Sequence, residues 1–284
     1  MTGDDHVLAR DLAGQAGTRL LELRAQGGDP DVLRKAGDRL SHEFLTAALA
    51  DARPGDVVLS EEGADNPARL TARRVWIVDP LDGTREFGEP GRTDWAVHVA
   101  LWESDALLAP GGTTLPALPP AAALPALPPA AAGPSPAGNL VAGAVALPAQ
   151  DRVLSTAEPP PPLPAGEAPA KIRIVVSRSR PPQFVRNISG LIEAELVPLG
   201  SAGAKVAAVI NGEVDAYVHG GGFYEWDTAA PVAVARAAGL HASRIDGSDL
   251  AYNQADLLMP DILVCRPAVA GVLLQAIREV THAP

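Results

Sequence analysis

The sequence predicts an α/β protein with an α+β N-terminal half and an α/β C-terminal half. In the N-terminal half, two amphipathic helices precede several short apolar strands with no long helix between them, which is typical of an antiparallel or mixed sheet. In the C-terminal half, strands and helices alternate, which indicates a layered α/β unit. Hydrophobic residues make up 47% of the 284-residue chain and few are aromatic, a composition suited to helices packed on sheets.

Two helices open the predicted N-terminal half. Apolar residues recur at helical spacing over residues 5–25 and again over residues 37–52, after which Pro54 and Gly55 end the pattern. The period then changes, and short strands are expected at residues 57–60, 75–78, 95–102, 140–147 and 152–155. Pro80 is expected to stop the second of these strands, because proline cannot donate a hydrogen bond to a sheet.

Two segments of biased composition interrupt the chain. Residues 104–138 are rich in Pro, Ala and Gly and are expected to form a mobile loop between two strands of the first sheet. Residues 158–170 are expected to link an N-terminal subdomain, residues 1–157, to a C-terminal subdomain, residues 171–284. In the second subdomain, strands are expected at residues 172–177, 196–199, 216–219 and 262–265, and helices at residues 182–193, 202–211, 227–238 and 268–280.

The charge of the chain restricts its partners. A formal net charge of −11 argues against binding to a nucleic-acid polymer or an anionic membrane, because both need a basic face. A small anionic substrate can still bind if cations lie between it and the protein. The single cysteine, Cys265, excludes an internal disulfide and a thiolate zinc site. Residues 1–13 lack the apolar stretch of a signal peptide and no segment suits a membrane span, so a cytoplasmic protein is expected.

The first segment that could carry chemistry is Trp-Ile-Val-Asp-Pro-Leu-Asp-Gly-Thr at residues 76–84. A buried strand delivers Asp79 and Asp82 at its C-terminal end, and Gly83 removes a side chain where another group must approach closely. Asp82 is expected to cap a helical turn whose Gly83 and Thr84 N–H groups would then bind phosphate. Carboxylates beside an anion need cations between them, and hard oxygen ligands favour Mg²⁺. On spacing alone, a capped turn with a spare surface aspartate is an equal alternative.

Three further segments gain meaning only in combination with the first. Glu61 follows an apolar strand within Ser-Glu-Glu-Gly at residues 60–63, where a solvated acidic turn is the simpler interpretation. Asp227 follows the glycines at residues 220–222 as a predicted helix N-cap, which ordinary capping explains as well as metal binding does. The small residues at 200–205 could cradle a phosphate or could serve close packing of a helix on a sheet.

Together these segments resemble the inositol monophosphatase superfamily over nearly the whole chain. The resemblance rests on Trp-x-Val-Asp-Pro-Leu-Asp-Gly-Thr-x-x-Phe at residues 76–87 and on Trp-Asp-x-Ala-Ala at residues 226–230. It implies a layered αβαβα sandwich. Thr-Arg-Glu-Phe at residues 84–87 and Glu-Trp-Asp-Thr-Ala-Ala at residues 225–230 resemble the CysQ type, which are 3′-phosphoadenosine-5′-phosphate phosphatases. Residues 94–102 look especially like actinobacterial members.

The resemblance also implies roles for the matching residues. Two or three Mg²⁺ ions would be held by four carboxylates and one backbone carbonyl, those of Glu61, Asp79, Asp82, Asp227 and Leu81. The substrate would contact Glu61, Leu81, Asp82, Gly83, Thr84 and Asp227. Thr84 and Glu61 would orient and deprotonate the attacking water, with support from Asp38. Asp38 stands where the family often has Asp-x-Ser-Pro-Val-Thr-x-Ala-Asp, of which this chain keeps only the last residue.

The implied activity is Mg²⁺-dependent hydrolysis of the 3′-phosphate of 3′-phosphoadenosine 5′-phosphate to AMP by a metal-activated water, in sulfate assimilation. Two alternatives stay open. The same site could act on an inositol phosphate or on fructose 1,6-bisphosphate, or the fold could serve a catalytically silent regulatory protein that binds nucleotide or metal. Ser201, Lys205, Tyr224 and Glu225 are candidates for lining the substrate pocket. The expected partner is a small phosphorylated substrate, and a homodimer is a further expectation.

Overall fold

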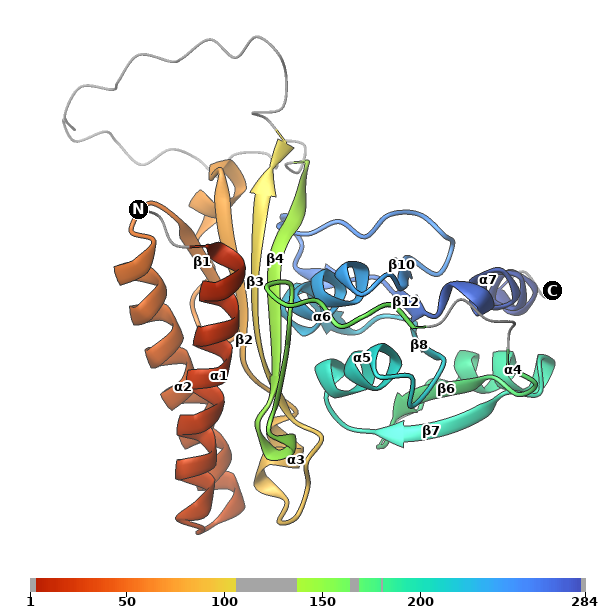
Figure 1. Cartoon of the computed structure of the whole chain (residues 1–284), viewed down its shortest axis with the longest axis horizontal. Helices are drawn as coiled ribbons and strands as arrows, with labels where there is room; N and C mark the ends of the chain where they lie inside the picture. Colours follow the sequence, from red (N-terminus) through yellow and green to blue (C-terminus); the bar gives the residue numbers. More distant parts are fainter. Residues whose placement is uncertain (1–3, 106–136, 164–168, 180, 282–284) are drawn as a thin grey trace, which may run out of the picture.

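The computed structural model describes residues 4–105, 137–163, 169–179 and 181–281. Its N-terminal half holds a five-stranded sheet in the order β1-β2-β3-β4-β5 (Figure 1). The strands are β1 Val57–Ser60, β2 Arg74–Asp82, β3 Ala96–Ser104, β4 Gly138–Leu147 and β5 Arg152–Ser155. β1 and β2 are parallel and the other neighbours are antiparallel, so the sheet is mixed, as predicted.

Two long helices, α1 (Asp5–Ala25) and α2 (Pro30–Ala52), cover one face of this sheet (Figure 1). α1 has the predicted bounds, but α2 begins well before the predicted start at residue 37. The reason is a strong start signal: the Asp29 side chain accepts N–H groups of the first turn, and proline follows at the first helical position.

β2 does not stop at Pro80 as predicted; it continues to Asp82. The register shifts on the way, because Asp79 faces His98 of β3 whereas Asp82 faces Ala96. Three residues on β2 therefore span two on β3, which is a β-bulge. In a regular strand, residues three apart point to opposite faces, and the extra residue brings the side chains of Asp79 and Asp82 to the same face. The bulge thus places both carboxylates in one site.

The C-terminal half contains a second five-stranded sheet in the order β10-β12-β8-β6-β7. Its strands are β6 Arg173–Ser177, β7 Glu195–Leu199, β8 Ala216–His219, β10 His241–Ser243 and β12 Ile262–Cys265. A short pair, β9 (Phe223–Tyr224) and β11 (Leu258–Met259), stands apart from it. The predicted alternation of strands and helices is confirmed, with parallel pairs at β6 and antiparallel pairs at β12.

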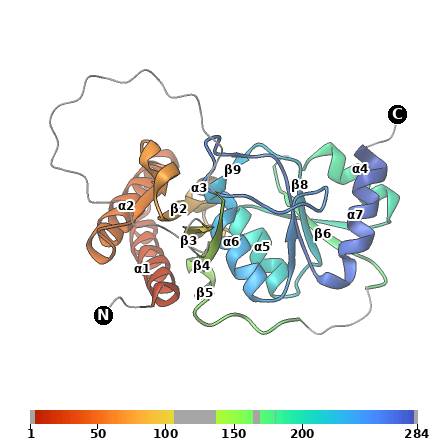
Figure 2. The same ribbon diagram turned by 90° about the horizontal axis from the view of Figure 1, so that it is seen from above.

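Helices complete five layers in the order αβαβα, as the resemblance implied (Figure 2). α5 (Ala202–Ile210) and α6 (Glu225–Ala237) lie between the two sheets, and α4 (Gln183–Leu191) and α7 (Pro267–Thr281) cover the outer face of the second. Small side chains let the middle layer pack closely: a Cβ at Gly143 of β4 would lie 2.6 Å from the Cβ of an alanine in α6. This packing brings the first turns of α5 and α6 to the end of β2.

Two expectations depend on segments of which only part is described. β3 and β4, on either side of the 104–138 segment, are neighbours in the first sheet, but most of that segment, including the predicted mobile loop, lies outside the described residues. The proposed subdomain boundaries around residues 158–170 stay a prediction. Within the described ranges, no helix has the length and apolar character needed to cross a membrane.

Candidate active site

Four acidic side chains and a histidine gather where the two halves meet. Asp79 and Asp82 lie at the end of β2 and His98 on β3; all three are buried, and ligand atoms from each lie within 4.8 Å of one another. Glu61 directly follows β1, which is the parallel neighbour of β2, so the two strands deliver acids to the same edge of the sheet. Asp227 joins them from the first turn of α6. The segments that the sequence suggested should meet do meet.

Burial and mutual repulsion raise the pKa of three of these acids. Burial raises the pKa of Asp79 most, and the charges of Glu61 and Asp82 add to it. Burial of its carboxyl group among protein atoms and the charge of Asp227 raise the pKa of Glu61 to about 7. This side chain still reaches solvent. Burial and Asp82 raise the pKa of Asp227 to about 6. The cluster therefore holds negative charge that a hard cation would neutralise.

Asp82 differs from these acids because two hydrogen-bond donors bind one of its oxygens and a histidine lies beside it. Its Oδ2 accepts the N–H of Gly203 at 2.6 Å and the hydroxyl of Ser201 at 2.5 Å, and the Nε2 of His98 lies 3.2 Å away. Burial alone would raise the pKa of Asp82, but His98 and Lys205 outweigh it and help to lower the pKa to about 2. Since all three contacts reach Oδ2, Oδ1 is the oxygen that can take a further ligand.

Asp82 does not cap the helical turn that follows it, contrary to the prediction. That turn, α3 (Thr84–Gly88), starts after Gly83, whose φ of +82° glycine adopts without strain. The Asp82 carboxylate binds instead at Gly203 in the first turn of α5, where the helix dipole favours negative charge. A Cβ at Gly83 would lie 3.1 Å from the Cβ of Ser201, so other parts of the chain approach closely at this glycine, and its contact with substrate stays a prediction.

Thr84 and Asp38 come together although 46 residues separate them. The hydroxyl of Thr84 donates to the carbonyl of Leu81 at 3.0 Å and lies 3.3 Å from Oδ1 of Asp38, which comes from the middle of α2. Burial and the charge of Glu62 raise the pKa of Asp38 to about 6, although Thr84 opposes the rise. Because a carbonyl has two lone pairs, the bond to Thr84 leaves Leu81 able to hold a ligand as well. That role stays a prediction.

Asp227 is not the N-cap of α6, as the sequence suggested, but its third residue. Its Oδ2 accepts the N–H of Tyr224 at 2.6 Å, as an acid three residues into a helix does in a capping box. Capping therefore occupies one oxygen, while burial and the charge of Asp82 raise the pKa of the group. The metal-binding role of Asp227 stays a prediction.

Two of the residues considered for the substrate pocket contact backbone instead. Lys205 is buried, and its Nζ donates to the carbonyl of Ser201 at 2.6 Å. Glu225 is also buried, and its carboxylate accepts two N–H groups from a later loop. Tyr224 is exposed, with its ring stacked on that of Trp226 at a centroid distance of 4.8 Å.

His98 was not predicted from the sequence. It is the one polar side chain in the apolar run at residues 96–101, where a core histidine and a site histidine look alike. Its Nδ1 lies 3.1 Å from the carbonyl oxygen of Trp226 and 3.9 Å from Oδ2 of Asp79. The informative signal is its place opposite Asp79 in the sheet, and that place depends on the pairing of β2 with β3.

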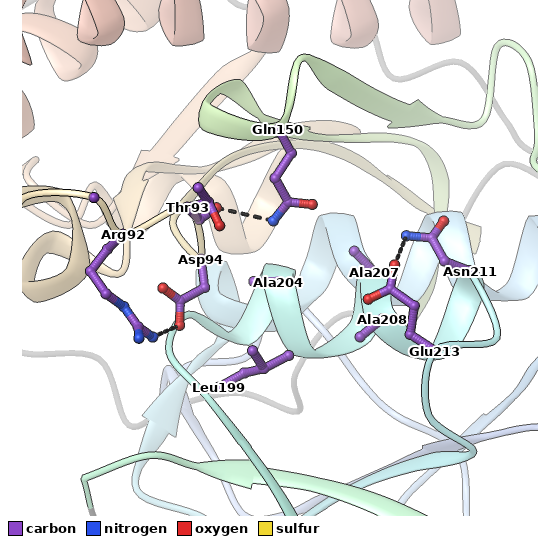
Figure 3. Close-up of a pocket in the computed structure, with 11 residues that line it drawn as sticks. Arg92, Thr93, Asp94, Gln150, Leu199, Ala204, Ala207, Ala208, Asn211 and Glu213 are labelled. Atoms are coloured by element: carbon purple, nitrogen blue, oxygen red, sulfur yellow. Dashed lines mark hydrogen bonds and ion pairs between the residues drawn. The ribbon is translucent and has the colours of Figure 1, made fainter. Parts of the chain in front are cut away.

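A cavity of about 460 Å³ opens between residues 91–94 and α5 (Figure 3). None of the predicted site residues is among the described residues that line it. Its wall includes Asp94, which pairs with Arg92 and accepts the N–H of Gly200 at 2.6 Å. Because the next residue, Ser201, donates to Asp82, this wall supports the loop that holds the carboxylate.

Comparison with known proteins adds to this geometry. The profile of the inositol monophosphatase family matches residues 9–115 and 135–282. The chain is 47% identical over 279 residues to the 3′-phosphoadenosine 5′-phosphate phosphatase of Mycobacterium leprae (strain TN). The matched region covers 97% of this chain and 94% of that protein. It is 49% identical over 270 residues to the protein of the same name from Mycobacterium tuberculosis (strain CDC 1551 / Oshkosh), at 93% and 90% coverage.

A solved structure supports the fold independently. Inositol monophosphatase II from Staphylococcus aureus MSSA476 superposes with a TM-score of 0.71 at 20% identity, covering 97% of this chain and 95% of that one. At this identity the likeness shows the fold alone, and it agrees with the five layers described above. Profile, relatives and fold lead to one conclusion: the chain belongs to the inositol monophosphatase family.

Proposed function

We propose that the chain is a Mg²⁺-dependent phosphomonoesterase that hydrolyses the 3′-phosphate of 3′-phosphoadenosine 5′-phosphate to give AMP and inorganic phosphate. The observation that carries the phosphatase chemistry is the meeting of Glu61, Asp79 and Asp82 with Asp227 beside the Gly83 turn. The choice of substrate is supported by the two mycobacterial relatives that carry this name at 47% and 49% identity. The reaction would serve sulfate assimilation.

The residues present fit a hard divalent cation. Their donors are carboxylate oxygens, the ligand type that Mg²⁺ prefers, and burial, together with repulsion between their charges, raises the pKa of three of the carboxyl groups. The residues that would hold two or three ions are Glu61, Asp79, Asp82 and Asp227, with the carbonyl of Leu81. When bound, Mg²⁺ would supply the positive charge that activates a water and offsets the charge on the phosphate and the leaving oxygen.

The side chains around this cluster would position the water and the phosphate. Thr84, held between Leu81 and Asp38, would fix the direction of the attacking water. Glu61, whose carboxyl group is crowded by other acids and gains from protonation, would take the proton that the water loses. α3 has only five residues, so the phosphate would be held by N–H groups of the Gly83 turn more than by a helix dipole.

In-line attack requires the water and the leaving oxygen on opposite sides of the phosphorus, so positioning contributes more than proton transfer. The rigid parts of the site agree with this requirement. Asp82 is fixed by Ser201 and Gly203, and Asp227 by the N–H of Tyr224, so both carboxylates are held before any ligand binds.

Release of inorganic phosphate from a panel of substrates tests the proposal. The full chain would be assayed with 3′-phosphoadenosine 5′-phosphate, inositol 1-phosphate and fructose 1,6-bisphosphate, each with Mg²⁺ and with EDTA. We expect the highest kcat/KM for the nucleotide, and loss of activity in EDTA that added Mg²⁺ restores. A higher kcat/KM for either of the other substrates would overturn the substrate assignment. Nucleotide binding without phosphate release from any substrate would favour the silent regulatory protein instead.

A cytoplasmic location and a homodimer remain predictions from the sequence. Gel filtration with light scattering on the purified chain would decide the second.

A further inference from the structure

Arg69 is a buried arginine outside the acidic cluster, with only 1% of its side chain exposed. It lies in η1 (Pro67–Thr71), within the connection from β1 to β2. A buried guanidinium is costly unless its N–H groups are paired, so each contact of this side chain is informative. On one side Asp65 binds it in a bidentate manner, with Nε–Oδ1 at 2.7 Å and Nη2–Oδ2 at 3.2 Å.

On its other side Arg69 binds the C-terminal half of the chain. Its Nη1 donates to the side-chain oxygen of Asn253 at 3.0 Å and to the carbonyl of Gln254 at 2.8 Å. Asn253 returns a bond from its Nδ2 to the carbonyl of Arg69 at 2.9 Å. Asn253 is fully buried and has a φ of +58°, a left-handed conformation that asparagine tolerates better than most residues. The contact therefore joins the two halves through a specific and completely desolvated pair.

The segment that Arg69 holds is bound in turn to the start of α6. The carboxylate of Glu225 accepts the N–H of Asn253 at 2.6 Å and that of Gln254 at 2.7 Å, and its own N–H donates to the carbonyl of Leu257 at 3.0 Å. Further along the helix, Thr228 accepts the hydroxyl of Tyr252 at 3.2 Å. Asp227 lies between these two attachment points.

These contacts form a continuous connection between two of the predicted metal ligands. Asp65, where it begins, is four residues after Glu61, and Glu225, where it ends, is two residues before Asp227. Glu61 comes from the N-terminal half and Asp227 from the C-terminal half, and their charges repel each other. The shared apolar core and the bonds of Asp82 also join the halves, but this connection begins beside Glu61 and ends beside Asp227, so it can set the separation of these two carboxyl groups.

We propose that Arg69, Asn253 and Glu225 are positioning residues that set the separation of Glu61 from Asp227 and thereby the affinity of the site for Mg²⁺. The inference rests on the proposed function only in taking the acidic cluster as the Mg²⁺ site. None of the three side chains needs to touch the ion or the substrate. Their effect resembles that of the hydrogen-bond partners that orient metal ligands in other proteins, whose loss lowers metal affinity.

Isothermal titration of the metal-free full chain with Mg²⁺ tests this proposal directly. Arg69→Met removes the guanidinium, and Asn253→Ala removes the amide while leaving the pair with Asp65 intact. We expect each variant to bind Mg²⁺ about 10- to 100-fold more weakly than the wild type. The double variant should bind Mg²⁺ with nearly the same affinity as whichever single variant binds it more weakly, because both changes break the same connection. Arg69→Lys, which keeps the charge but not the planar fork, should fall between.

The matched control is Arg244→Met, because Arg244 also makes a bidentate pair with an aspartate, Asp261, at 2.7 and 2.6 Å, but within the C-terminal half. It should lose some thermal stability, though less than Arg69→Met because Arg244 is more exposed, and it should keep wild-type Mg²⁺ affinity. In phosphate-release assays, Arg69→Met should regain its kcat when Mg²⁺ is raised, with an unchanged KM for the nucleotide.

Two results would overturn the inference and can be told apart. If the wild type binds Mg²⁺ and Arg69→Met and Asn253→Ala bind it equally well, the inference fails and the proposed function stands. If the wild type itself binds no Mg²⁺, the proposed function fails and the inference with it. Where Arg69→Met does not fold, as judged by circular dichroism, Asn253→Ala and Arg69→Lys give the same comparison.

Discussion

Replacing Asp82 by asparagine removes one negative charge and one acceptor oxygen from the site while keeping its shape. The structure limits how the new amide can sit. If its oxygen takes the place of Oδ2, it keeps the bonds from Ser201 and Gly203, but its NH₂ group then points to the position that a cation needs. If the amide turns over, NH₂ faces the N–H of Gly203, and two donors oppose each other. Either orientation loses an interaction that the carboxylate makes.

The size of the effect follows from that loss. Removing one preorganised charge-stabilising group typically costs about 100- to 1,000-fold in turnover, so Asp82→Asn should lose at least about 100-fold in kcat. At 1.36 kcal/mol for each factor of ten, this corresponds to about 2.7 kcal/mol of transition-state stabilisation. Raising Mg²⁺ should restore little of it, because the amide cannot supply the missing charge.

The assay is phosphate release from 3′-phosphoadenosine 5′-phosphate at saturating substrate, over a range of Mg²⁺ concentrations. Asp249→Asn is the matched control, because Asp249 is exposed and lies outside the cluster. It should keep wild-type turnover. If Asp82→Asn turned over at near the wild-type rate while folded, the assignment of this segment as the catalytic centre would be wrong.

Other perturbations separate the remaining roles. Thr84→Val should lower kcat at least about 100-fold by freeing the water from its oriented hydroxyl, whereas Thr71→Val, at an exposed hydroxyl, should leave phosphate release unchanged. Gly83→Ala should destabilise the fold by about 1–3 kcal/mol in urea titrations, because an L-residue is strained at φ +82° and its Cβ would press on Ser201; unchanged stability would contradict this. Metal-free protein should lose thermal stability as the pH rises from about 4 to about 7. The folded-state pKa values of Glu61 and Asp227 are raised to about 7 and about 6, so the folded chain binds more protons than the unfolded chain in that window. Mg²⁺ should therefore raise the melting temperature more at pH 8 than at pH 5, and an equal rise at both would count against a metal site built from these acids.

Short-range patterns predicted most of the secondary structure. α1, β1, β5, β8 and β12 have the expected bounds, and the four strands are short runs rich in apolar residues. The errors lie where a local signal was outweighed or overlooked. At α2 the Asp29 cap and the proline after it define the start, although regular apolar spacing begins only later. At β2, Pro80 did not end the strand because a bulge accommodates it before Asp82.

Contacts between distant segments account for what the sequence could not predict in the site. His98 becomes a site residue only because β3 pairs with β2 in a register that places it opposite Asp79. The pairing of Arg69 with Asn253 joins residues 184 positions apart, and neither has a local pattern that marks it. The candidate ligands were predicted from the resemblance of residues 76–87 and 226–230 to the inositol monophosphatase superfamily, whereas the geometry of these residues could not be predicted from the sequence.

Asp82 shows why the acidic motif was ambiguous when considered alone. One of its oxygens binds Ser201 and Gly203 at the start of α5, which makes this side chain part of the contact between the two halves. The other oxygen is left to the site. Asp82 does not cap the turn that follows it, and its contact with α5 is compatible with the proposed metal-binding role because the two use different oxygens. The contact with α5 also favours the ionised form of Asp82, and that charge adds to burial in raising the pKa of Asp79 and Asp227 nearby. The fold thus maintains repulsion among these acids without a cation, and binding of Mg²⁺ would relieve it, so metal affinity and folding stability should be coupled.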